Sequence, residues 1–83
     1  MSEKEQEILE NIDPELVEKV TDDMVNSFNQ NDKRSWREVY NDNIEKYTTD
    51  RQMATYIEAR VVTQLTLRGF DIDFKPYSLT RYK

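Results

Sequence analysis

Asp73, Phe74 and Lys75 form the arrangement in this chain that comes closest to an active site. A carboxylate two positions before a lysine can hold Mg²⁺, while the lysine orients water or stabilises the charge that develops during hydrolysis. Glu58, in the helical stretch before the triplet, is the further carboxylate that fits such a set. A site of this kind also needs a carboxylate on a neighbouring strand, which the sequence does not offer. The triplet is therefore better explained as part of an amphipathic strand.

The same triplet resembles that of metal-dependent nucleases, but the resemblance covers one helix–strand junction and identifies no family. The rest of the composition excludes the usual catalytic groups. The chain has no cysteine and no histidine, so it lacks a thiol nucleophile and the commonest general base and zinc ligand. Its single glycine cannot form a phosphate-binding loop, and no acidic pair has the spacing of a calcium loop. We expect no catalytic residue, cofactor, metal or small-molecule substrate.

The charge of the chain is unevenly distributed. Residues 1–32 carry ten acids and two bases, whereas residues 33–83 carry ten bases and seven acids. An acidic helical surface can imitate nucleic acid and occupy the basic cleft of an enzyme, as a small phage-type inhibitor would. The acidic surface residues expected in that role are Glu3, Glu7, Glu10, Glu15, Glu18, Asp22 and Asp23. The net charge of −5 opposes direct nucleic-acid binding, which we do not expect.

Side chains that can cap a first turn divide the chain into helices. A short acidic helix is expected over residues 1–12, and amphipathic helices are expected to start at Asp13, Ser35 and Thr49. Gly69 suits the left-handed position that ends the last helix. These signals predict a mainly α fold, a small bundle of three to four amphipathic helices with a C-terminal β-strand or extended tail, in one domain over residues 1–83.

Residues 70–75 alternate apolar and polar side chains, which predicts a half-buried strand. With only a tail over residues 76–83 left beside it, this strand lacks an evident neighbour for its backbone hydrogen bonds. We therefore expect a homodimer, or a complex with another protein, formed through the C-terminal segment. The residues expected to contact the partner are Phe70, Ile72, Phe74, Tyr77 and Tyr82. In an alternative α+β fold, residues 61–67 form a strand of a hairpin that turns at Arg68-Gly69.

These patterns together indicate a non-catalytic protein–protein interaction module, such as a small adaptor, regulator or inhibitor. The nucleic-acid mimic is the alternative function. The charged N-terminus and the lack of a long apolar run indicate no membrane partner and a cytoplasmic location. The expected core residues are Leu16, Val17, Val20, Met24, Phe28, Trp36, Val39, Tyr40, Ile44, Ile57, Val61, Leu65, Phe70 and Ile72.

Overall fold

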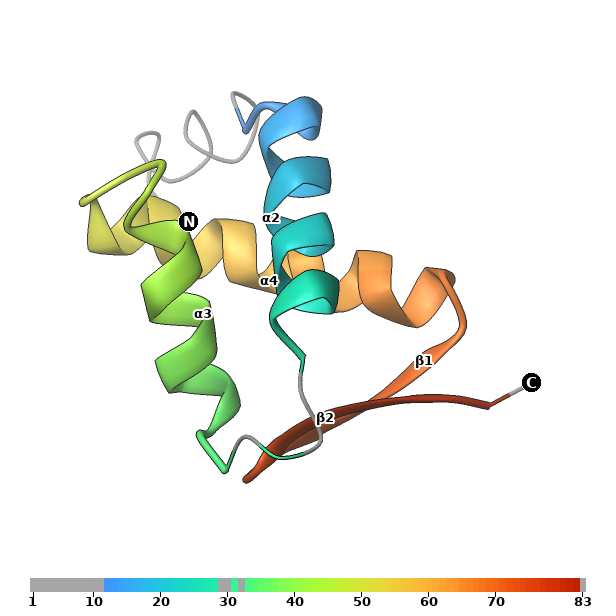
Figure 1. Cartoon of the computed structure of the whole chain (residues 1–83). Helices are drawn as coiled ribbons and strands as arrows, with labels where there is room; N and C mark the ends of the chain where they lie inside the picture. The colour runs from blue at the N-terminus through green and yellow to red at the C-terminus, as the bar shows by residue number, and fades with distance from the viewer. Residues whose placement is uncertain (1–11, 29–30, 32, 83) are drawn as a thin grey trace.

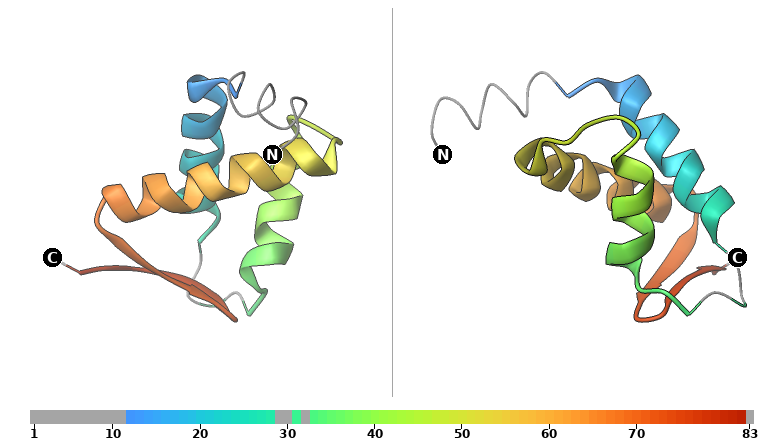
Figure 2. Two further views of the ribbon diagram at one scale, coloured as in Figure 1. Left: turned by 180° about the vertical axis from the view of Figure 1, so that it is seen from behind. Right: turned by 60° about the vertical axis from the view of Figure 1, so that its left-hand side comes forward.

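Three helices are followed by an antiparallel hairpin (Figure 1). The structure is a computed structural model that describes residues 12–28, 31 and 33–82. Its elements are α2 (Pro14–Ser27), α3 (Trp36–Ile44), α4 (Arg51–Leu67), β1 (Phe70–Phe74) and β2 (Tyr77–Arg81). The predicted mainly α fold with a C-terminal β element is thus confirmed. The long helix α4 crosses α2 and α3, and the hairpin lies below them (Figures 1 and 2), so the expected bundle is not confirmed.

The helix starts follow from local capping chemistry. The Asp13 carboxylate accepts a hydrogen bond from a backbone N–H of the first turn of α2 at 2.9 Å. Ser35 and Glu38 form the predicted capping box at the start of α3. The third helix begins one residue later than predicted, because Asp50 rather than Thr49 is its N-cap. The Asp50 carboxylate accepts from two backbone N–H groups, at 2.9 and 3.2 Å. The short helix expected over residues 1–12 falls almost wholly outside the described residues.

The end of α4 decides between the two predicted C-terminal folds. Residues 61–67 are helical, so the strand that the alternative placed there is wrong, whereas the C-terminal hairpin of that alternative is confirmed. Gly69 has a φ of 92°, and its N–H donates to the Thr66 carbonyl at 3.0 Å, as expected for a left-handed residue after a helix. The hairpin of the alternative fold exists, but its turn lies at Lys75-Pro76 instead of Arg68-Gly69.

The hairpin also corrects the expectation that residues 70–75 have no neighbour and that residues 76–83 are a tail. Strand β2 pairs with β1 over its whole length, with Ile72 opposite Leu79 and Phe74 opposite Tyr77. The backbone groups of β1 on that side are therefore satisfied within the chain. This pairing removes the argument from which a homodimer through the C-terminal segment was expected.

The core lies between the helices and the inner face of the hairpin. Ten of the predicted residues are buried, and β2 adds two that were not predicted, Tyr77 and Leu79. Four predicted core residues are only partly buried and pack against the rim of the core: Leu16, Phe28, Phe70 and Ile72. The aromatic ring of Tyr77 meets that of Trp36 edge to face at 5.3 Å. This aromatic contact is one of those that attach the hairpin to the helices, together with the hydrogen bond from the Tyr77 hydroxyl to the Met24 carbonyl. None of the helices among the described residues is long and apolar enough to cross a membrane.

Candidate protein-docking groove

Of the residues with nuclease-like spacing, Glu58 and Lys75 line the same groove, but Asp73 does not join them. Asp73 is exposed and lies opposite Ser78, on the outer face of the hairpin. Phe74, its neighbour, faces the helices and touches Trp36, because successive strand residues point to opposite faces. Glu58 lies on that helical side and accepts a hydrogen bond from the Trp36 indole N–H at 2.8 Å. In the described part of the chain, no three acidic side chains are close enough to hold a metal ion.

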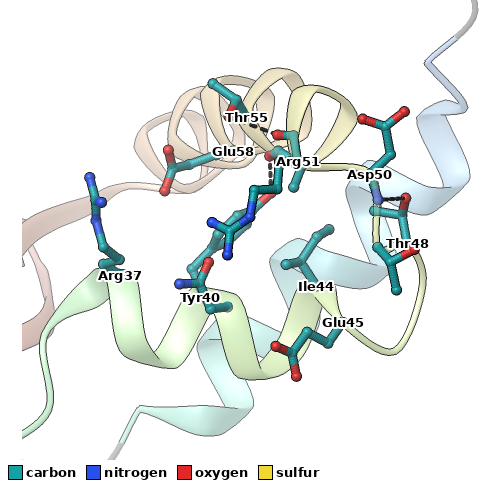
Figure 3. A pocket seen from close by; sticks show the side chains of 12 residues that line it. Arg37, Tyr40, Ile44, Glu45, Thr48, Asp50, Arg51, Thr55 and Glu58 are labelled. Atoms are coloured by element: carbon teal, nitrogen blue, oxygen red, sulfur yellow. Dashed lines mark hydrogen bonds between the residues drawn. The ribbon is translucent and has the colours of Figure 1, made fainter.

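A pocket of about 570 Å³ lies between α3 and the first half of α4 (Figure 3). Arg51 extends from α4 across it towards α3, and Arg37 and Glu58 flank its other end (Figure 3). The Tyr40 hydroxyl donates to the Ala54 carbonyl at 2.6 Å. Burial, and to a lesser degree the charge of Glu58, raise the pKa of Tyr40, so its phenol stays protonated at neutral pH. The pocket therefore holds charged and hydroxyl groups, and its one phenol, that of Tyr40, is not activated as a nucleophile.

The second depression is an open groove of about 980 Å³ between the start of α3, the middle of α4 and the hairpin turn. We call it the Phe74 groove. It is lined by Ser35, Trp36, Arg37, Glu38, Thr55, Glu58, Ala59, Val62, Phe74 and Lys75. Apolar side chains thus come to it from all three elements. The groove is therefore an open depression that combines an apolar part with charged side chains of both signs.

Phe74 is the most unusual member of this groove, because 48% of its surface is exposed. Its ring meets the Trp36 ring edge to face at 5.6 Å. The Trp36 indole is itself fixed by its hydrogen bond to Glu58 and by stacking on Tyr40, with ring centroids 5.9 Å apart. The apolar floor of the groove is therefore held in one orientation, while the Phe74 ring is open to solvent.

The predicted partner-contact residues separate into buried and exposed ones. Tyr77 is in the core, so it is not available as a contact residue; its hydroxyl donates to the carbonyl of Met24 at 2.8 Å. Phe70 and Ile72 are partly buried against the core. Phe74 and Tyr82 are exposed at opposite ends of the hairpin; Phe74 lines the groove, and Tyr82 lies outside it.

The helical members of the groove were not predicted as contact residues from the sequence. Trp36 was predicted as core, and it is 5% exposed, yet its ring also forms the groove floor. Ala59 and Val62 lie three positions apart on α4, which places them on one face of a helix. That spacing is a sequence signal, but nothing in the sequence indicates that Phe74 lies across from them.

The predicted acidic surface is partly engaged in internal contacts. Its described members are Glu15, Glu18, Asp22 and Asp23, all on α2. Asp22 forms an ion pair with Arg68 at 2.8 Å, and Asp23 accepts a hydrogen bond from the Tyr47 hydroxyl at 2.5 Å. The other predicted members lie outside the described residues: Glu3, Glu7 and Glu10. Two of the four described acids thus already have protein partners, which leaves fewer free carboxylates for a basic cleft.

Comparison of the chain with protein-family models, with curated proteins and with solved structures found no match.

Proposed function

We propose that this protein is a non-catalytic protein–protein interaction module that docks a partner protein in the Phe74 groove. The observation that carries the proposal is the half-exposed Phe74 ring at the mouth of an open groove whose floor is Trp36. Aromatic side chains that are partly exposed beside an apolar depression are typical anchors of protein interfaces.

The energetics of the hairpin support the same interpretation. Phe74 and Tyr77 face each other across the strands, but only Tyr77 is buried. Burial of a phenylalanine side chain stabilises a protein by about 2 kcal/mol, so leaving half of one in water forgoes part of that gain. A partner that covers the ring recovers it at the moment of binding. The groove is therefore best suited to the apolar side chains of another protein.

The proposal is tested with two groove variants and two matched controls. Phe74→Ser removes the exposed ring, and Ala59→Gln fills the groove from a helix position that is already exposed. The control Thr63→Gln also introduces a glutamine on α4, one turn after Ala59 and outside the groove. The control Leu67→Ser removes an apolar side chain that also lies outside the groove and is 74% exposed. The wild-type protein is used to isolate a partner from its source cells, and the purified partner is then titrated against all four variants.

We expect both groove variants to weaken binding at least about tenfold and both controls to leave it within about twofold, since buried anchors dominate interface energies. Circular dichroism verifies that each variant is folded. The proposal fails if no partner binds or if groove variants and controls bind alike. Titrations at increasing salt test the nucleic-acid mimic: binding through the acidic surface should weaken steeply with ionic strength and should be insensitive to Phe74→Ser.

A further inference from the structure

The acidic and basic side chains that line the Phe74 groove differ in whether they already form hydrogen bonds within the protein. Two carboxylates line it, and both already accept hydrogen bonds from the protein. Glu38 accepts from the Ser35 backbone N–H at 3.3 Å, and Glu58 accepts from the Trp36 indole at 2.8 Å. These contacts hold the two carboxylates against the start of α3, where they also serve to cap the helix and fix the groove floor.

Two cations line the same groove, Arg37 on α3 and Lys75 in the hairpin turn, and both are exposed. Within the described part of the chain neither has a hydrogen-bond or ion-pair partner; the ion pairs there join other cations, Arg34 and Arg68, to aspartates. Glu38 and Glu58 keep their negative charges, but each has an oxygen engaged within the protein, whereas the donors of Arg37 and Lys75 are all open to a ligand. An arginine and a lysine on either side of an apolar floor can each form a charge-assisted hydrogen bond with a carboxylate.

Resting on the proposed function, we propose that the partner of the Phe74 groove is an acidic peptide segment with an apolar anchor. The anchor packs against Phe74 and Val62, and flanking glutamates or aspartates pair with Arg37 and Lys75. A basic segment with the same anchor binds less tightly, because its charges would meet Arg37 and Lys75, while Glu38 and Glu58 are already engaged within the protein. We call Arg37 and Lys75 the rim of the groove. Their charges thus select among apolar segments that the groove would otherwise bind equally well.

Trp36 is the only tryptophan of the chain, so its fluorescence reports on ligands entering the groove. The probes are three synthetic peptides that share an apolar stripe of two leucines and a phenylalanine. Their remaining positions are all glutamate, all glutamine or all lysine. At low salt we expect the glutamate peptide to bind at least about tenfold more tightly than the glutamine peptide, and the lysine peptide to bind most weakly. The difference should shrink as salt is raised, because the rim is exposed to solvent.

Variants assign the preference to the rim. Combining Arg37→Gln with Lys75→Gln should reduce the glutamate preference to about twofold or less and leave the affinity for the glutamine peptide unchanged. Combining Arg51→Gln with Arg60→Gln removes the same charge outside the Phe74 groove, and we expect it to retain most of the preference.

The outcomes distinguish this inference from the proposed function. If all three peptides bind equally and Ala59→Gln weakens them all, the groove is a docking site without charge selection and the inference is wrong. If the control pair abolishes the preference as fully as the rim pair does, net charge rather than the rim selects the ligand, and the inference is wrong. If no peptide changes Trp36 fluorescence at millimolar concentration, both the inference and the groove as a docking site are contradicted.

Discussion

The Tyr77 hydroxyl provides the sharpest test of how the hairpin is held to the helices. It donates a buried hydrogen bond of 2.8 Å to the carbonyl of Met24, one of the last four carbonyls of α2. The Phe28 N–H, which would bond to that carbonyl in a continuing helix, donates to Val25 instead. The C-terminal end of α2 is therefore capped by a side chain from β2, 53 positions further along the chain.

Replacing Tyr77 by phenylalanine removes this bond and leaves the Met24 carbonyl without it. A buried acceptor that loses its partner costs about 1–3 kcal/mol, and the remaining ring still fills the core. We therefore expect Tyr77→Phe to lower the free energy of unfolding by about 1–2 kcal/mol. For a chain of this size that corresponds to a drop in melting temperature of roughly 4–8 °C per kcal/mol. Urea unfolding followed by Trp36 fluorescence and by circular dichroism measures the change.

Tyr82→Phe is the matched control, because the Tyr82 hydroxyl also donates to a helix carbonyl, that of Thr66, at 2.9 Å. This second bond is exposed, and the Thr66 carbonyl also accepts from the Gly69 N–H, so water can replace the hydroxyl at little cost. We expect the control to change stability by less than about 0.5 kcal/mol. Equal effects of the two substitutions would refute the argument that burial of the Met24 carbonyl makes the Tyr77 bond important.

Three further predictions concern the local signals and the pH dependence. A Cβ added at Gly69 would meet no atom within 4 Å, so Gly69→Ala should lower the free energy of unfolding by about 1 kcal/mol through the positive φ alone. Asparagine tolerates a positive φ, so Gly69→Asn should lower it less; thermal unfolding of both variants measures the difference. Asp50→Ala should lower stability by about 1 kcal/mol, whereas Thr49→Ala should change it by less than about 0.5 kcal/mol; the reverse order in urea unfolding would contradict the assigned N-cap. Burial raises the pKa values of Tyr40 and Tyr77, so the folded state holds these protons more tightly than the unfolded state does. Their stabilisation is complete below the unfolded tyrosine pKa, near 10, and is lost as pH rises above it; urea midpoints measured from pH 8 to 11 should fall only in the upper part of this range.

The helices could be predicted because their signals are local. Asp13, Ser35 and Gly69 act on backbone groups within a few residues, so their types and positions alone indicate where helices begin and end. The error of one residue at the start of α4 has the same origin. Thr49 and Asp50 can both cap a helix, and the sequence pattern favoured the capping box of Thr49 over the carboxylate that accepts two hydrogen bonds.

The hairpin was harder to predict because its partner strand is short and follows a proline. In β2 the apolar Tyr77 and Leu79 alternate with Ser78 and Thr80, a period of two that indicates a strand. This signal covers only five residues and was outweighed by Pro76, which cannot donate a ladder hydrogen bond. Pro76 lies in the turn, where no such bond is required. The position of the proline, rather than its presence, was the informative feature.

The groove could not be predicted because its contacts connect distant parts of the chain. The hydrogen bond between Trp36 and Glu58 spans 22 positions, and the ring contact between Trp36 and Phe74 joins α3 to the hairpin turn. From the sequence, Glu58 is a candidate only as a catalytic carboxylate, since the sequence cannot show that Glu58 accepts a hydrogen bond from the Trp36 indole. Phe74 was correctly expected on the apolar face of its strand, but its exposure depends on what the helices leave uncovered.

In the proposed function, Tyr77 and Phe74 have different roles: Tyr77 holds the hairpin to the helices, and Phe74 contacts the partner. Both rings contact Trp36, at 5.6 and 5.3 Å, and they lie opposite each other at the end of the strands. Tyr77 also reaches Phe28, at 5.9 Å, and the end of α2, so helices surround it and it becomes part of the core. Phe74 has Trp36 as its aromatic neighbour and an open groove beside it. The buried ring thus carries the hydrogen bond to α2, while the exposed half of the Phe74 ring is the part that the proposed partner would cover.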